Sequence, residues 1–292
     1  MKILLTGAEG QLGRCVQDRC TDQVLIALSR TGLDITDISA VQAAFDLHQP
    51  DLVVNAAAFT AVDRAEQEPE LAFAVNRDGA ENLAIACAQQ AIPLIHISTD
   101  YVFDGRAILP YRPDSPVNPL GVYGQSKWQG EEAVRNTLNQ HLIIRTAWVF
   151  SEYGNNFVKT MLRLGTEREQ LSVVDDQLGC PTYAGHLADT VLALAPLVFQ
   201  AGFSGWGTYH FAGDRSLSWH QLAQVIFAQA FSLGVMKKIP KVLPIPTAQY
   251  PTPAMRPACS VLDSSKLATL LPEPFSNDWR QGLRFVLVKL SG

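Results

Sequence analysis

Tyr123 and Lys127 stand four residues apart and could together carry out acid–base chemistry. Residues with this spacing share one face of a helix, which places an ammonium group beside a phenol. The pKa of an unperturbed tyrosine is about 10, and a nearby cation lowers it by roughly 1–3 units. We therefore expect Tyr123 to give or take a proton near neutral pH. The chain has seven tyrosines, so the meaning of the pair depends on its surroundings.

The start of the chain has the pattern of a dinucleotide-binding loop. A short apolar run, Ile3–Leu5, predicts a buried parallel strand. Gly7, Gly10 and Gly13 then permit a tight turn, close approach of a pyrophosphate and tight packing of a helix on the strand. The helix predicted over Gln11–Arg19 would offer unpaired N–H groups and its positive dipole end to phosphates. Together with the acid–base pair, this loop supplies both halves of a hydride-transfer site.

The end of the second predicted strand, Val24–Leu28, bears on the choice of cofactor. This strand end commonly carries an acidic residue that binds the ribose 2′-hydroxyl of NAD. Here it carries Ser29 and Arg30, and an arginine can bind a 2′-phosphate in bidentate fashion. We therefore favour NADPH, with NADH as the alternative. Asp34 and Ile35 follow as further candidate cofactor contacts. In the alternative, Asp34 binds the adenosine and Arg30 is only an exposed loop residue.

Strands alternate with helices through the first half of the chain. Apolar runs at Leu52–Val54, Pro93–Ile97 and Leu142–Arg145 predict strands, and Pro69–Gln90 predicts a long amphipathic helix. This alternation predicts an α/β fold with a Rossmann-type, doubly wound parallel sheet. We expect a smaller, mainly C-terminal lobe to bind substrate.

After residue 150 the pattern is less regular. It predicts helices over Asn156–Leu164 and His186–Phe199 and a strand over Leu171–Val174. The expected dinucleotide-binding domain spans residues 1–150 with returning segments near 171–213, and the expected substrate-binding lobe spans residues 151–170 and 214–292. Six prolines in Ile239–Pro257 exclude a helix or a central strand. We interpret this stretch as an ordered wall of the second lobe, with a flexible linker as the alternative.

The composition of the 292 residues, 47% hydrophobic and 17% charged, is that of an ordinary globular protein. The formal net charge of -5 disfavours nucleic acid and anionic membrane surfaces as partners. No apolar run approaches the roughly 20 residues that span a bilayer, and the N-terminus lacks a signal-peptide pattern, so we expect a cytoplasmic protein. Five cysteines without a Cys-x-x-Cys spacing predict free thiols, and six scattered histidines predict no bound metal.

Several longer strings point to one family. The glycine pattern, the pair of Tyr123 and Lys127, and the string Val75-Asn76-x-x-Gly79-x-x-Asn82-Leu83 resemble the extended short-chain dehydrogenase/reductase family. More narrowly, the chain resembles the family of dTDP-4-dehydrorhamnose reductases. The strings that carry this resemblance are residues 55–63, 98–103, 145–149, 154–163 and 251–257. They cover most of the chain in the order expected.

The resemblance implies roles for these residues. Tyr123 would protonate the oxygen on C4 of a keto sugar as the cofactor delivers hydride. Lys127 would hold the nicotinamide ribose and keep the phenol acidic. Thr99 would hydrogen-bond the reacting oxygen. The residues implied at the cofactor are Gly10, Gln11 and Leu12 at its pyrophosphate and Ala58, Phe59 and Thr60 along its length. The residues implied at the dTDP-sugar substrate are Thr99, Asp100, Trp148, Asn156 and Arg256.

Three of these substrate contacts have structural alternatives, because Trp148 could belong to the core, Asp100 could cap a turn, and the backbone could satisfy the Thr99 hydroxyl. The string Thr99-Asp100-Tyr101 also lacks the glutamate with which related 4,6-dehydratases remove the C5 proton. The resemblance therefore implies reduction. An epimerase, a reductase of another nucleotide sugar and a non-catalytic regulatory subunit remain alternatives, although a binding module has no need for Thr99, Tyr123 and Lys127 together.

Two further expectations concern charge and assembly. A diphosphate on a net-acidic protein needs local positive charge, and Arg256 is the best candidate for it. Lys159 and Arg163, four apart on a predicted helix, are as consistent with a solvated face. Some enzymes of the family dimerise around Mg²⁺ held by glutamates, but the matching positions here are Cys15 and Gly185. We expect a monomer or a homodimer without such a metal bridge.

Overall fold

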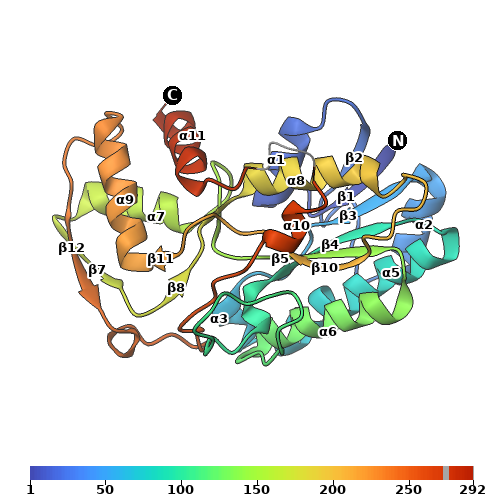
Figure 1. The fold of residues 1–292 in the computed structure, drawn as a ribbon, viewed down its shortest axis with the longest axis horizontal. Helices are drawn as coiled ribbons and strands as arrows, with labels where there is room; N and C mark the ends of the chain where they lie inside the picture. The colour runs from blue at the N-terminus through green and yellow to red at the C-terminus, as the bar shows by residue number, and fades with distance from the viewer. Residues whose placement is uncertain (272–275, 292) are drawn as a thin grey trace.

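A six-stranded sheet forms the centre of the computed structural model, which describes residues 1–271 and 276–291 (Figure 1). The strands lie in the order β10-β5-β4-β3-β1-β2, and every neighbouring pair is parallel. Their bounds are β1 Lys2–Thr6, β2 Val24–Leu28, β3 Leu52–Asn55, β4 Leu94–Thr99, β5 His141–Thr146 and β10 Gly207–His210. This arrangement confirms the predicted α/β fold with a doubly wound parallel sheet.

The chain reverses its direction across the sheet between β1 and β3. From β1 it passes outward to β2, and it then returns to the other side of β1 to form β3, β4 and β5. Ligands of open α/β sheets bind at such a reversal, beyond the carboxyl ends of the strands. The loops that follow β1, β3 and β4 therefore surround the expected dinucleotide site.

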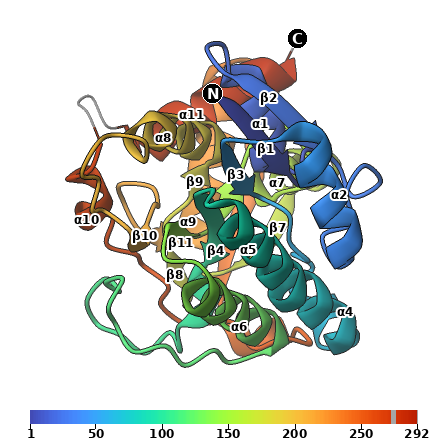
Figure 2. The ribbon, with the colours of Figure 1, turned by 90° about the vertical axis from the view of Figure 1, so that its right-hand side faces the viewer.

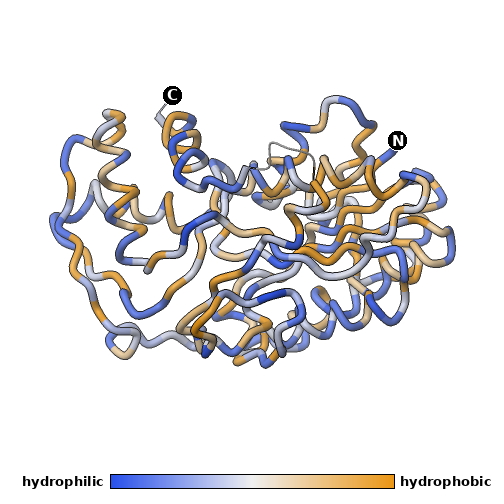
Figure 3. Tube along the Cα trace, viewed as in Figure 1, coloured by the Kyte–Doolittle hydropathy of each residue, from blue (hydrophilic) through white to orange (hydrophobic). Residues whose placement is uncertain are grey.

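Helices cover both faces of the sheet (Figure 2). The helices on one face are α1 (Gln11–Arg19) and α8 (Ala184–Leu197), and those on the other are α2 (Ile38–His48), α5 (Gly79–Gln90) and α6 (Val122–Thr137). Successive strand side chains point to opposite faces, so Ile3 and Leu5 pack against the first group and Leu4 against the second. Figure 3 shows the hydrophobic residues gathered along these strands.

A π-helical turn interrupts the long helix predicted over Pro69–Gln90. The chain forms α4 (Pro69–Phe73), the π-turn η1 (Ala74–Asp78) and then α5 without leaving the helical path. Such turns are rare and often lie at functional sites. Here the turn contains the buried Asn76, whose side chain bonds to the backbone of Phe59.

A second group of elements packs around a separate apolar core. Its members are α7 (Phe157–Glu167), α9 (Trp219–Ser232), α11 (Trp279–Ser291) and the parallel pair β7 (Gln170–Val174) and β12 (Lys241–Ile245). The helix and strand predicted near residues 156–174 are thus present. Within the stretch 171–213, β10 is a strand of the central sheet and α8 packs on that sheet. Strand β7 belongs to the second group.

The proline-rich stretch contributes β12, the outer member of a two-stranded sheet. Pro244 lies opposite Val173 of β7, and a proline is tolerated there because an edge strand needs donors on one side only. After η3 (Thr247–Gln249) the chain returns toward α3 (Val62–Ala65), where the Ala254 N–H donates to Asp63 at 3.2 Å. The stretch is therefore a wall that joins the second group to the central one, and not a free linker.

The remaining elements are short. They are η2 (Asp100–Val102), β6 (Val149–Phe150), β8 (Leu178–Gly179), β9 (Thr182–Tyr183), β11 (Leu217–Ser218) and α10 (Ser265–Ala268). In residues 1–271 and 276–291, no helix combines the length and the apolar character needed to cross a membrane.

Candidate functional site

A cleft of about 690 Å³ lies at the carboxyl ends of β1, β3, β4 and β5. Most residues predicted to bind cofactor or substrate line it. They are Gly7, Gly10, Gln11, Leu12, Arg30, Asp34, Ile35, Ala58, Phe59, Thr60, Thr99, Asp100, Tyr123, Lys127 and Trp148. Four predicted residues are absent from the lining, namely Gly13, Ser29, Asn156 and Arg256.

The glycine-rich loop forms one wall of the cleft. Gly7 has a φ of +70°, and a Cβ there would lie 2.6 Å from the backbone of Ala56. A Cβ on Gly13 would lie 2.2 Å from the carbonyl oxygen of Gly7, so Gly13 sets the contact between α1 and the loop without facing the cleft. The N-cap residue of α1 is Gly10, which has no side chain to cap the helix. Its backbone N–H groups therefore suit a pyrophosphate.

The far end of this wall holds the residues expected at the adenosine. Arg30 is exposed and lines the cleft together with Asp34. The carboxylate of Asp34 accepts hydrogen bonds from the backbone and hydroxyl of Thr36, which lower the pKa of Asp34. Ser29 is turned to a different partner, since its hydroxyl lies 2.9 Å from that of Thr31. The cation at this end is thus supplied by Arg30.

Tyr123 and Lys127 enter the cleft from the first two turns of α6. The start of this helix is fixed by Glu66, whose carboxylate accepts the Val122 N–H at 2.8 Å. Tyr123 is partly buried and meets the ring of Tyr101 edge-on, with centroids 5.4 Å apart. Lys127 is buried, and its Nζ donates to the carbonyl oxygen of Ile97 at 2.7 Å.

The pKa values at this pair differ from the expectation. Burial raises the pKa of Tyr123, which hydrogen bonding with the Thr99 side chain only partly offsets. Burial also lowers the pKa of Lys127 to about 8, although the Glu131 carboxylate acts in the opposite direction. The predicted acidification of the phenol by Lys127 is therefore absent here, because burial disfavours the charged form of each group.

Asn76, which was named in a family string but given no role from the sequence, ties two parts of the cleft together. Its Oδ1 accepts the Phe59 N–H at 2.8 Å, and its Nδ2 donates to the Phe59 carbonyl and to Ser126 Oγ at 3.1 and 3.0 Å. The Ser126 hydroxyl in turn donates to the Tyr123 carbonyl at 2.8 Å. One buried amide thus ties the cleft loop 58–60 to the helix that holds the acid–base pair. The signal in the sequence was its place in the string Val75-Asn76-x-x-Gly79-x-x-Asn82-Leu83.

Thr99 and Asp100 face the cleft and are also bonded to each other. The Thr99 hydroxyl donates to Asp100 Oδ1 at 3.0 Å and accepts the Tyr101 N–H at 3.2 Å. Burial raises the pKa of Asp100 to about 6, although hydrogen bonds from Ser260 and Thr99 oppose this. The Thr99 hydroxyl is thus bonded to the backbone, as considered for it, and Thr99 rather than Asp100 caps η2. Both residues still line the cleft.

Trp148 sits between the cleft and the second core. Its φ of +46° is unusual for a residue with a side chain, and its indole stacks on that of Trp219 with centroids 3.4 Å apart. The ring also lies against Gly179, where a Cβ would come within 2.3 Å of it. Trp148 therefore has both of the roles considered for it. It packs against the second core, and it presents part of its surface to the cleft.

The remaining candidates for the substrate side are engaged elsewhere. Asn156 caps α7 and donates to Gln11 Oε1 at 2.9 Å. Arg256 donates to Asp63 at 2.7 Å and to the hydroxyl of Tyr101 at 2.8 Å, so its charge is paired. The other two expected cations also have partners. Lys159 donates to the Glu152 carbonyl, and the exposed Arg163 pairs with Glu167.

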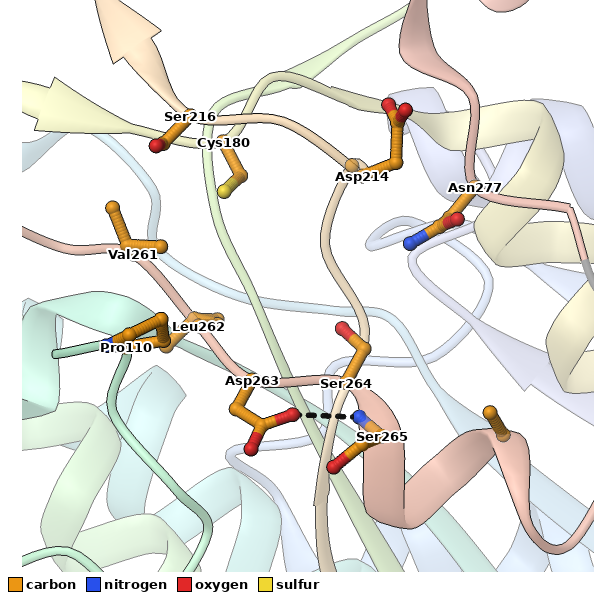
Figure 4. A pocket seen from close by; sticks show the side chains of 12 residues that line it. Pro110, Cys180, Asp214, Ser216, Val261, Leu262, Asp263, Ser264, Ser265 and Asn277 are labelled. Atoms are coloured by element: carbon orange, nitrogen blue, oxygen red, sulfur yellow. Dashed lines mark hydrogen bonds between the residues drawn. The ribbon is translucent and has the colours of Figure 1, made fainter.

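A second hollow of about 430 Å³ lies apart from the predicted residues (Figure 4). Asp214 and Asp263 line it, and the Asp263 carboxylate accepts the Ser265 N–H at 2.8 Å. No basic side chain lines it among residues 1–271 and 276–291, so it does not suit a phosphorylated ligand. In the same residues no cluster of three or more His, Cys, Asp or Glu side chains could hold a metal ion.

Comparison with known proteins gives the family. A family model described as the RmlD substrate binding domain matches residues 1–291. A dTDP-4-dehydrorhamnose reductase from Aggregatibacter actinomycetemcomitans is 41% identical over 287 residues, which are 97% of this chain and 97% of that protein. The chain belongs to the dTDP-4-dehydrorhamnose reductase family. The resemblance identified from the sequence is thereby confirmed.

Solved structures of this family share the whole fold. A dTDP-4-dehydrorhamnose reductase from Clostridium acetobutylicum has a TM-score of 0.91 and 38% identity and covers 100% of both chains. One from Bacillus anthracis, in complex with NADP, has a TM-score of 0.89 and 37% identity and covers 99% of both. A UDP-glucose 4-epimerase from Thermus thermophilus, in complex with NAD, has a TM-score of 0.81 at 20% identity, which shows a shared fold and no more.

Proposed function

We propose that this protein reduces the 4-keto group of dTDP-4-dehydro-L-rhamnose to give dTDP-L-rhamnose, with NADPH as the cofactor. The observation that carries the proposal is the meeting of Tyr123, Lys127 and Thr99 in a cleft walled by a glycine-rich loop, in a chain 41% identical to a reductase of that name. NADPH, when bound, supplies the hydride. The uncapped start of α1 and the exposed Arg30 are the features that fit its phosphates.

The residues of the chain would then act as follows. Tyr123 gives its phenolic proton to the C4 oxygen, which becomes an alkoxide as hydride arrives. Thr99 would turn its hydroxyl from Asp100 to the same oxygen, and the hydrogen bond that it donates there would stabilise the charge that develops. Lys127 holds the nicotinamide ribose, and its ammonium stabilises the phenolate that Tyr123 leaves behind. Gly10, Gln11 and Leu12 contact the pyrophosphate through the start of α1. The cofactor contacts along the cleft are Ala58, Phe59 and Thr60.

The substrate would lie between the cleft and the second core. Asp100 and Trp148 line that side, and Arg256 is bonded to Tyr101 of the lining and paired with Asp63. The two separate apolar cores support a division into a dinucleotide-binding domain and a substrate lobe. The five cysteines are free thiols, which supports the cytoplasm as the compartment.

The test is a turnover assay with purified protein, NADPH and dTDP-4-dehydro-L-rhamnose. We expect oxidation of NADPH, and we expect Tyr123→Phe to lower kcat by about 10²–10⁴, the usual contribution of a general acid. Tyr250→Phe is the matched control, because Tyr250 is exposed and lies outside the cleft. Full activity of Tyr123→Phe would remove the assigned proton donor. Conversion of the sugar without net loss of NADPH would indicate an epimerase, and no reaction with either sugar or cofactor would favour a regulatory subunit.

A further inference from the structure

A row of buried polar side chains crosses the sheet beneath the cleft. Thr6, Asn55 and His96 are register partners on the neighbouring strands β1, β3 and β4. All three are at most 1% exposed, and none lines the cleft. Lys127 of α6 ends the row, with Nζ 3.4 Å from His96 Nε2. The row therefore connects the strand that leads into the glycine loop with the lysine of the acid–base pair.

The orientation of Asn55 fixes the ring of His96. Asn55 Oδ1 accepts the Ala57 N–H at 3.1 Å, and a backbone N–H can only donate. It also accepts the hydroxyl of Thr6 at 2.7 Å. The opposite atom of the amide, Nδ2, must then face His96 Nδ1, at 3.0 Å, and donate to it. In a neutral imidazole that accepts at Nδ1, the proton is on Nε2.

We propose that His96 is a positioning residue that turns its Nε2–H toward Lys127 and thereby favours the neutral amine over the ammonium. The inference rests on the proposed function, in which Lys127 assists Tyr123. At 3.4 Å the contact between Lys127 Nζ and His96 Nε2 is longer than an ordinary N–H hydrogen bond, so it gives the ammonium little stabilisation. The ammonium keeps one acceptor close by, the carbonyl of Ile97.

The other charged groups around Lys127 do not cancel this effect. Glu131, one turn further along α6, is buried and committed to Arg145 of β5 and to Arg135, at 2.7 and 2.6 Å. The Glu131 carboxylate therefore offsets only part of the effect of burial on the charge of Lys127. Arg135 and His141 also act on His96 and, with burial and Lys127, keep the pKa of His96 well below its usual range, so the ring is neutral. The low pKa of Lys127 agrees with this arrangement.

The first measurement needs only the wild-type protein. We record long-range ¹H–¹⁵N spectra of histidine-labelled protein with NADPH at pH 7. We expect the His96 ring to be protonated at Nε2 and unprotonated at Nδ1. The variant His96→Leu identifies the signals by their loss. A ring protonated at Nδ1, or at both nitrogens, would overturn the inference. This readout needs no sugar substrate, so failure of the proposed reaction and failure of the inference are separate outcomes.

The second measurement reverses the tautomer. Asn55→Asp keeps the shape of the side chain but replaces the donor by an acceptor, so His96 should carry its proton on Nδ1 and offer Nε2 to the ammonium. We expect the alkaline limb of the kcat/KM profile to move up by about one pH unit or more. Thr6→Val is the control, because the Ala57 N–H still orients the amide, and we expect neither the tautomer nor the limb to change.

A double variant separates the tautomer from the added charge. In a His96→Leu background, Asn55→Asp should no longer move the alkaline limb. An equal shift in that background would mean that the new carboxylate acts on Lys127 directly, and would overturn the role of His96. If Asn55→Asp does not fold, the wild-type spectrum still decides the inference.

Discussion

The two sides of the cleft, one proposed for the nucleotide and one for the sugar, are built in different ways. On the nucleotide side, consecutive residues at strand ends present backbone groups and small side chains, as in the loop that starts at Gly7 and in the segment 58–60. On the sugar side, single side chains from distant segments meet, such as Asp63 and Arg256, which bond across 193 positions of sequence. A local motif can therefore encode the first side, whereas the second exists only in the folded chain.

The largest effect we expect on binding comes from the rigidity of the nucleotide side. Gly13→Ala places a Cβ against the Gly7 carbonyl, and moving either backbone segment away costs free energy. We expect NADPH binding to weaken by about 1–3 kcal/mol, the range for overpacking a tight contact. Titration with NADPH measures it. Gly234→Ala is the control, because its positive φ also strains the backbone. A Cβ there would have no heavy atom within 4 Å beyond its chain neighbours among the described residues, so NADPH affinity should stay as in the wild type. Normal affinity in Gly13→Ala would mean that this side can adapt.

A smaller effect is expected at the exposed end of the same side. Arg30→Ala should raise the KM for NADPH by about tenfold or more and leave that for NADH nearly unchanged, because a charged hydrogen bond contributes roughly 1.5–3 kcal/mol. Steady-state kinetics with both cofactors measure this. Arg14→Ala, an exposed arginine outside the cleft lining, is the control. Equal losses with both cofactors, or a strong wild-type preference for NADH, would remove Arg30 from the 2′-phosphate.

The sugar side can be examined by splitting one ion pair. Arg256→Ala should raise the KM for the sugar nucleotide about fivefold or more, a modest loss for a charged contact. Asp63→Asn leaves the guanidinium in place and removes its competing carboxylate, so the KM should not rise. Melting temperatures of both variants show how much of each change is structural. An equal rise of KM in the two variants would show that Asp63 positions Arg256, and that the arginine does not act alone.

The smallest effect concerns pH. Because burial lowers the pKa of Lys127 to about 8, the ammonium is present below that pH and is lost as the pH rises through it. We expect kcat/KM to fall about twofold at that pKa and then tenfold per further unit, as for loss of a single essential proton. A profile of kcat/KM against pH measures this limb. Activity that stays flat to pH 10 would show that the ammonium is not required or that it titrates higher.

The sequence predicted the parts of the molecule that depend on neighbouring residues. The glycine loop, all five strands expected in the central sheet and the helical face of Tyr123 and Lys127 follow from periodicity and spacing. Helix α2 was overlooked, although Asp37 caps it and Val41 and Phe45 bury one face. The partners of Arg256 could not be predicted, because no local pattern encodes a contact between distant loops. The raised pKa of Tyr123 was also out of reach, since spacing reports proximity and not burial.

The amide of Asn76 has a consequence for attempts to redesign the protein. It holds the backbone of Phe59 on one side and Ser126 on the other, so the two walls share a single buried hydrogen-bonding group. Substitutions near Phe59 and near Ser126 should therefore be energetically coupled, as neighbours within one network are. If the two segments are varied separately, the free-energy changes of the best variants will not add when they are combined. A library that varies both segments together measures the combined change directly.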